Sequence, residues 1–93
     1  MTKTDARIVL KAVIDESESS AAKYGDFVSA HEAYGVLAEE VAELLDAIRS
    51  NKRFSIQREA IQVAAVALRF AQEIEGASDA FIARSGWTRH DGA

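Results

Sequence analysis

Three glutamates lie where amphipathic helices would carry apolar residues. Glu40 and Glu43 belong to the segment HEAYGVLAEEVAELLDAI, and Glu59 belongs to REAIQVAAVALRFA. On a helical projection at about 100° per residue, Glu40 falls inside the apolar arc of its segment, and Glu43 lies at the edge of that arc. Apolar residues flank Glu59 within about 40° on either side. Because a carboxylate that faces a core is costly unless it is paired, protonated or bound to a cation, we expect a metal ion at this place.

The spacing of these residues suits oxygen ligands of a divalent cation. Glu40 and Glu43 lie on neighbouring helical turns, with β-carbons about 5–6 Å apart, and Glu59 and Gln62 repeat that spacing. If the two helices pack antiparallel, the four side chains can converge. Mg²⁺ and Mn²⁺ prefer such oxygen ligands in an octahedral arrangement. Glutamates three positions apart also occur on many solvated helices, so their place within the apolar arcs is what favours a metal site.

Composition excludes several other classes of function. The 93 residues carry a formal net charge of −4, whereas binding to a nucleic-acid backbone requires a basic surface. The chain has no cysteine, so neither a disulfide framework nor thiolate chemistry is possible. Its first residues contain no leader-like apolar region, and no apolar run approaches membrane length. We expect a cytoplasmic protein that binds neither a membrane nor a nucleic-acid polymer.

The elements that position the glutamates are predicted to be helices. The chain contains no proline and little strand-like alternation, which indicates an all-α fold. Cap and turn signals divide it into three long helices and a tail, at about 4–24, 29–50, 55–75 and 77–93. Ser29 and Glu32 form a capping box for the second helix, and Ser55 can cap the third. We expect a single domain over 1–93, a bundle of three main helices plus a short C-terminal segment that begins with a further short helix.

The helix faces favour association of identical chains. One face of the first helix is apolar and comprises Leu10, Val13, Ile14, Ser17, Ala21 and Tyr24. Its other side, which includes Glu16, is expected to be solvated. In the third helix, Ile61, Ala65 and Leu68 lie opposite the arc that holds Glu59, so apolar residues nearly surround it. A helix of this kind is buried on two sides, and we expect another subunit of a homodimer or homotetramer to complete the bundle.

The acidic positions follow a recognisable order. The run EEVAE at 39–43, followed by Glu59-x-x-Gln62, resembles the EExxE…ExxD pattern of the MazG-like all-α nucleoside triphosphate pyrophosphohydrolases. The resemblance covers residues 29–75. It implies a helical bundle that assembles as a dimer or tetramer, binds Mg²⁺ and cleaves a (deoxy)nucleoside triphosphate to the monophosphate and pyrophosphate. Such an activity would serve the house-cleaning of a nucleotide pool.

The resemblance also implies roles for individual residues. Carried over by position, Glu40, Glu43 and Glu59 would be metal ligands, and Glu39 would be a nearby acid that orients water. The Asp of the pattern is Gln62 here. A glutamine carbonyl can coordinate Mg²⁺, but it is neutral and cannot accept a proton from an attacking water. Two alternatives therefore stay open: a helical oligomer that binds metal, nucleotide or a partner without turnover, and an interaction module with incidental acids.

Several residues outside this pattern could contact a substrate. Lys52 and Arg53 lie in the connection before the third helix, where they could meet phosphates, although loop cations are commonly just solvated. Arg69, two turns beyond the glutamine, could contact a phosphate or pair with Glu73 four residues later. Trp87 could cover a pocket of a neighbouring subunit or anchor the tail.

Overall fold

Helices account for the regular structure of the protein wherever the computed structural model describes it, namely over residues 2–74 and 76–83. They are α1 (Ala6–Tyr24), α2 (Ala30–Arg49), α3 (Arg53–Ile74) and α4 (Asp79–Ala83). The prediction of three main helices and a short C-terminal helix is confirmed, and the three long helices begin and end within two residues of the predicted positions. None of the described helices is long and apolar enough to cross a lipid bilayer.

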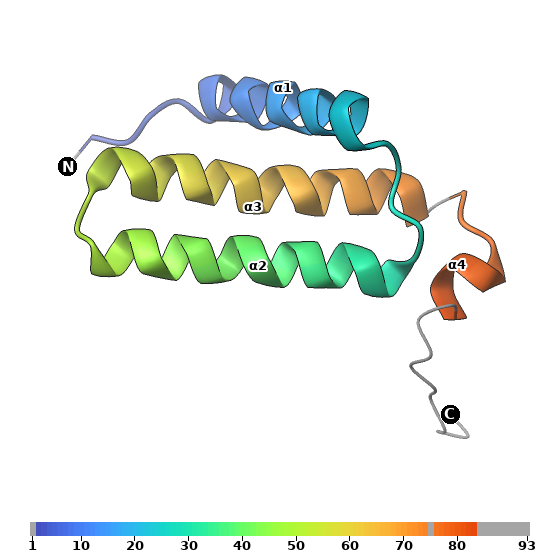
Figure 1. Cartoon of the computed structure of the whole chain (residues 1–93). Coiled ribbons are helices and arrows are strands. Elements are labelled where there is room, and N and C mark those ends of the chain that lie inside the picture. Colours follow the sequence, from blue (N-terminus) through green and yellow to red (C-terminus); the bar gives the residue numbers. More distant parts are fainter. Residues whose placement is uncertain (1, 75, 84–93) are drawn as a thin grey trace.

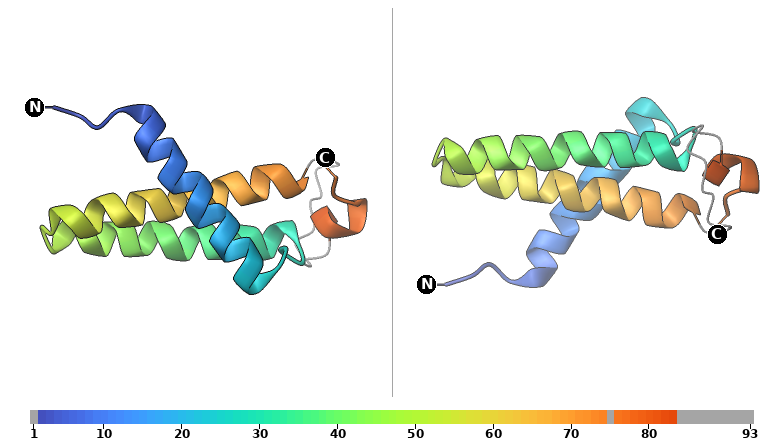
Figure 2. Two further views of the ribbon diagram at one scale, coloured as in Figure 1. Left: turned by 90° about the horizontal axis from the view of Figure 1, so that it is seen from above. Right: turned by 90° about the horizontal axis from the view of Figure 1, so that it is seen from below.

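Helix α3 lies between the other two long helices (Figure 1). α2 and α3 run antiparallel side by side, whereas α1 crosses the other side of α3 at an angle (Figure 2). The expectation that another subunit covers the second apolar side of α3 is therefore wrong, because α1 of the same chain takes that place. Phe81 of α4 packs against a small cluster formed by Phe27, Ala33 and Val66, where the two ends of the α2–α3 pair meet the α1–α2 connection.

The helix ends explain where the chain turns. α1 stops at Gly25, whose φ of 76° is accessible to glycine, and whose N–H donates to the carbonyl of Ala21 at 2.9 Å. At the start of α2, the Ser29 hydroxyl accepts from the N–H of Glu32 at 3.0 Å, as the capping box predicts. The Glu32 carboxylate, however, accepts from the N–H of Val28 at 2.7 Å and so reaches one residue further back than expected.

The connection between α2 and α3 is shorter than the sequence suggested. Asn51 adopts a left-handed conformation with φ of 61°, which reverses the chain within residues 50–52. α3 therefore begins at Arg53, and Ser55 lies inside the helix rather than at its cap. The tight reversal brings α2 and α3 together as an antiparallel pair, which is the arrangement that the metal site requires.

The core of the described chain is small. Its buried hydrophobic residues are Val13, Phe27, Ala33, Ala47, Ala65 and Val66, and among the residues described no large side chain is fully buried. Large exposed hydrophobic side chains in the same ranges include Ile8, Leu10, Ile14, Tyr24, Tyr34, Val41, Leu45, Ile48 and Phe54. Among the described residues, exposed large apolar side chains thus outnumber those that are buried.

Helix α1 packs on α3 with a face that differs from the predicted one. Val13 and Ser17 are buried as expected, but Leu10 and Tyr24 of the predicted apolar face are exposed. Glu16 is half-buried, so the prediction that it is solvated is wrong. α1 crosses α3 obliquely and touches it over a limited length (Figure 2). Glu16 and Ser20 are half-buried beside the buried Val13 and Ser17, so the contact is centred nearer to Glu16 than the predicted face was.

Candidate metal centre

The three predicted glutamates converge between α2 and α3. Glu40, Glu43 and Glu59 each offer one carboxylate oxygen, and these three atoms all lie within 4.8 Å of one another. Oxygens at about 2.1 Å from an octahedral Mg²⁺ lie about 3–4.2 Å apart, so small side-chain rotations bring this set to ligand spacing. The prediction that these three side chains meet is confirmed, and we refer to them as the acidic cluster.

The fold places the cluster at the edge of an apolar interface. Val36 and Leu37 of α2 pack toward the core, so Glu40, on the same side of the helix, is directed at α3. Glu40 and Glu59 are half-buried, while Glu43 is exposed. An ion held here would therefore contact the protein on its inner side and remain open to solvent or substrate on its outer side.

Burial and neighbouring negative charges both act on Glu40. Burial raises the pKa of the Glu40 carboxyl above its ordinary value, and the negative charges of Glu43, Glu59, Glu16 and Glu39 raise it further. A divalent cation would offset both the burial and the neighbouring charges, because it coordinates the buried carboxylate and balances the negative charge of the other glutamates. The arrangement therefore favours either a proton or a cation at Glu40.

Arg58 provides a cation next to the cluster that the sequence analysis did not single out. Its Nη2 lies 3.5 Å from Oε2 of Glu59, and its side chain is largely exposed, whereas the Glu59 side chain is only 13% exposed. An ion pair of this length at the surface contributes little to stability, and the single positive charge of Arg58 cannot balance the negative charges of three carboxylates. Adjacent Arg and Glu residues are common on solvated helices, so the local sequence does not identify Arg58 as a residue near a metal site.

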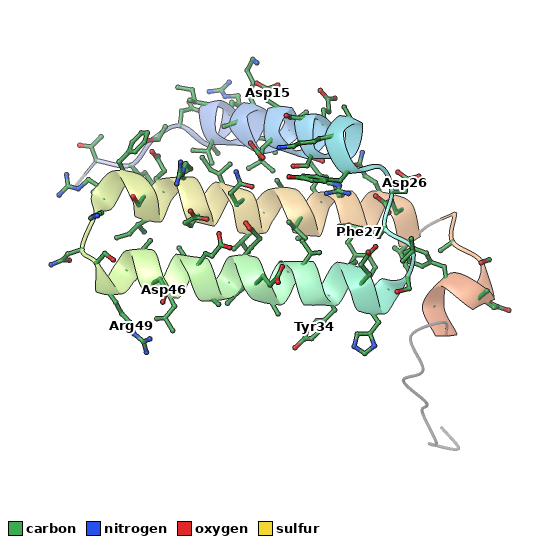
Figure 3. All side chains as sticks on the ribbon, in the orientation of Figure 1. Asp15, Asp26, Phe27, Tyr34, Asp46 and Arg49 are labelled. Carbon is green, nitrogen blue, oxygen red and sulfur yellow. The ribbon has the colours of Figure 1, made fainter. Side chains whose placement is uncertain are left out.

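Glu16 is the second residue near the site that sequence analysis missed. It comes from α1, and its charge is one of those that raise the pKa of Glu40. The Ser20 hydroxyl donates to Oε2 of Glu16 at 3.3 Å, which helps to hold the carboxylate in place. By contrast, Asp15 projects from the outer side of α1 (Figure 3). The two neighbouring acids look alike in sequence, and only the angle of α1 distinguishes them.

Glu39 and Gln62 flank the cluster. Gln62 lies one turn beyond Glu59 on α3 and is half-buried, so its side chain starts from the face that a fourth ligand would need. Glu39 is exposed and lines a cavity of about 510 Å³ beside the α1–α2 connection. The other side chains that line this cavity come mainly from the connection and from α2, and they include Tyr24, Phe27, Glu32 and Val36.

The cations predicted near phosphates lie at the two ends of the helix pair. Lys52 and Arg53 are exposed at the α2–α3 connection, and Arg53 is about 9 Å from Glu59 along the helix axis. Arg69 lies about 15 Å from Glu59 in the other direction. The structure thus does not bring these three residues into the acidic cluster.

Arg69 is instead part of the support of the α1–α2 connection. It is 6% exposed, its Nη2 donates to the carbonyl of Gly25 at 2.8 Å, and its guanidinium carbon lies 4.2 Å from the ring centroid of Phe27. Glu73 accepts from the N–H of Phe27 at 2.9 Å. The ion pairs observed among the described residues do not include the predicted one between Arg69 and Glu73; the two side chains bind the connection rather than each other.

Trp87 and the rest of the tail at 84–93 lie outside the described residues, so the prediction for this tryptophan stays a prediction. No protein-family model, curated protein or solved structure matches the chain.

Proposed function

We propose that the protein is a Mg²⁺-dependent nucleoside triphosphate pyrophosphohydrolase that acts in house-cleaning of a nucleotide pool. The observation that supports this proposal most directly is the convergence of Glu40, Glu43 and Glu59 within 4.8 Å. The order of Glu39 and these three glutamates in the sequence matches the MazG-like pattern, in which Gln62 stands in place of an Asp. We also infer that the chain forms a homodimer or homotetramer, because so many large apolar side chains are exposed.

The donor set fits a hard divalent cation. All three converging groups are carboxylates, which suit Mg²⁺ and Mn²⁺ better than metals that prefer nitrogen or sulfur ligands. The carbonyl of Gln62 can add a neutral oxygen. Without a cation, the net negative charge of the cluster would repel a triphosphate, so the substrate is expected to bind together with the metal.

The acidic residues would have two roles in hydrolysis, namely metal binding and activation of water. Bound Mg²⁺ would neutralise charge on the phosphate oxygens and favour in-line displacement. Glu40, Glu43 and Glu59 would hold the ion at the edge of the interface. Glu39, exposed beside them, orients a water molecule and accepts its proton as the water oxygen bonds to the α-phosphorus. The bond from that phosphorus to the bridging oxygen breaks, and pyrophosphate leaves.

The assay is release of pyrophosphate from a panel of ribo- and deoxyribonucleoside triphosphates, with Mg²⁺ or Mn²⁺. Glu40→Ala should reduce turnover to the background rate, because the ion loses one of its two half-buried carboxylates. Glu18→Ala is the matched control, since Glu18 is an exposed glutamate of α1 and should leave turnover unchanged. Equal rates for wild type and Glu40→Ala would contradict the assignment.

One observation favours a second candidate function. Gln62 leaves the site one formal charge short of the resembled pattern, and this favours a helical oligomer that binds metal and nucleotide without turnover. Calorimetry with Mg²⁺ and a non-hydrolysable triphosphate separates the two candidates when it is combined with the hydrolysis panel. Binding with no release of pyrophosphate supports the second.

A further inference from the structure

The cavity beside the α1–α2 connection lies on the same side of α2 as the acidic cluster. Glu32, Val36 and Glu39 line the cavity. Together with Glu43 of the cluster, they fall within an arc about 60° wide on the helical projection. The distance along the helix axis is about 10 Å from Glu32 to Glu39 and about 6 Å from Glu39 to Glu43. A ligand whose phosphates are held at the cluster would therefore extend past Glu39 into the cavity.

The size and the walls of the cavity suit a small planar group. Its volume of about 510 Å³ lies within the range of about 300–1,000 Å³ that is usual for small-molecule sites. Phe27, Tyr24 and Val36 supply its apolar wall. Phe27 is buried where the ends of α2 and α3 meet, whereas Tyr24 is 70% exposed (Figure 3). Aromatic side chains of this kind stack on the flat ring of a nucleobase.

The exposed polar groups of the cavity are hydrogen-bond acceptors. They are the carboxylates of Asp26, Glu32 and Glu39. Asp26 forms no side-chain hydrogen bond or ion pair with any other described residue. One oxygen of Glu32 accepts from the N–H of Val28, which leaves its second oxygen available. Because ionised carboxylates accept but do not donate, this lining favours a ligand edge that carries N–H groups and disfavours carbonyl oxygens.

Arg69 adds an unused donor to the lining of the cavity. The side chain is 6% exposed, and its Nε has no hydrogen-bond partner among the described residues. Its Nη2 is already occupied by the carbonyl of Gly25. A buried donor without an acceptor destabilises the protein, so an acceptor atom of a ligand seated against Arg69 would remove that cost. The cavity therefore presents one donor beside three acceptors.

We propose that this cavity binds the base of a nucleotide and selects bases that carry an exocyclic amine. The flat ring packs against Phe27, and the sugar passes Glu39 on the way to the cluster. The amine donates to Asp26 and Glu32, while an acceptor atom of the ring edge faces Arg69. A base with a carbonyl in place of the amine would direct an oxygen at the carboxylates and be repelled. The inference rests on the proposed function only for the place of the phosphates at the cluster.

The experiment is calorimetry of the full chain with nucleoside monophosphates in the presence of Mg²⁺. Two pairs are compared, namely cytidine with uridine monophosphate and adenosine with inosine monophosphate. In each pair the second member has a carbonyl where the first has an amine. The amine-bearing member should bind at least about tenfold more tightly, because its N–H groups meet charged acceptors. Monophosphates are products of the proposed reaction, so the measurement requires no turnover.

A double variant tests whether the cavity is responsible for the preference. Asp26→Asn combined with Glu32→Gln should reduce the preference to within about threefold, since an amide can turn its NH₂ toward a carbonyl oxygen. The glutamine carbonyl can still accept from the N–H of Val28, so the start of α2 is kept. Asp46→Asn combined with Glu18→Gln is the matched control outside the cavity, and it should keep the full preference. Asp46 lies toward the other end of α2 (Figure 3).

The outcomes separate this inference from the proposed hydrolysis. Equal affinities within both pairs, or no binding of any of the four nucleotides at millimolar concentration, overturn the inference whether or not pyrophosphate is released from triphosphates. A preference that the double variant retains overturns the assignment to this cavity. A preference in one pair alone supports the inference and identifies the ring size. A preference in a protein that releases no pyrophosphate supports the inference and contradicts only the catalytic proposal.

Discussion

Replacing Glu40 with glutamine should stabilise the metal-free protein while weakening its response to Mg²⁺. Three carboxylate oxygens within 4.8 Å repel one another, and Glu40 takes part in two of the three pairs. At an effective dielectric constant of about 20–40, each pair costs roughly 2–3 kcal/mol, and solvent at the open edge of the cluster reduces that to about 1 kcal/mol or less per pair. Glu40→Gln keeps the shape of the side chain but removes both repulsions, so we expect a gain of about 1–2 kcal/mol.

The measurement is thermal unfolding with and without metal. For a domain of this size, a gain of about 1–2 kcal/mol raises Tm by at least about 5 °C. In wild type, Mg²⁺ at ten times its Kd adds about 1.4 kcal/mol of stability. Glu40→Gln should lose most of that addition, because a tenfold weaker affinity leaves only about 0.4 kcal/mol at the same concentration. The variant should therefore melt above wild type without Mg²⁺ and respond weakly when Mg²⁺ is added.

Glu18→Gln is the control for this experiment. It makes the same chemical change at an exposed position of α1, and both its Tm without metal and its Mg²⁺ response should match wild type. A metal-free Glu40→Gln protein that melts below wild type would refute the repulsion argument. An undiminished Mg²⁺ response in the variant would show that Glu40 does not ligate the ion.

Four further outcomes are expected. The Tm advantage of Glu40→Gln over wild type should shrink as the pH falls from about 7 to about 5. The pKa of Glu40 is raised in the folded protein, so the ionised carboxylate destabilises the fold at pH values above that pKa. Protonation of Glu40 in wild type at lower pH removes this destabilisation. Glu16→Gln should raise the metal-free Tm in the same direction but by less, because Glu16 ranks behind burial, Glu43 and Glu59 among the causes of the raised pKa. Gln62→Asp should tighten Mg²⁺ binding by about tenfold in calorimetry, since it adds a charged ligand; unchanged affinity would place Gln62 outside the site. Ser29→Ala should lower the free energy of unfolding by about 1 kcal/mol in urea titration, through loss of the cap on α2.

The sequence was sufficient to predict the acidic cluster because its geometry is largely local. Helical periodicity places Glu40 and Glu43 on adjacent turns, and the tight reversal at 50–52 forces α2 and α3 to pack antiparallel. Glu59 then lies opposite this pair without any further information. The bounds of the helices were predictable for the same reason, because caps and turns are encoded by neighbouring residues.

Features that depend on contacts between distant segments were not predictable in this way. Nothing in α1 itself fixes the angle at which it crosses α3, so the burial of Glu16 and the exposure of Leu10 were both missed. Arg69 looked like a partner for Glu73 on the same helix, yet it binds the carbonyl of Gly25, which is 44 positions away. The periodicity of one helix shows which faces are apolar, but it does not show which neighbour covers each face.

The support of the α1–α2 connection by α3 sets the order in which the chain can assemble. Gly25 and Phe27 are bound by Arg69 and Glu73, which come at the end of α3 and are synthesised late. The α2–α3 hairpin closes over a short loop and can form early, whereas α1 has no final anchor until the last turn of α3 has left the ribosome. We therefore expect α1, although it is made first, to dock last. Until then the face of α3 beneath it stays open to chaperones and to other nascent chains.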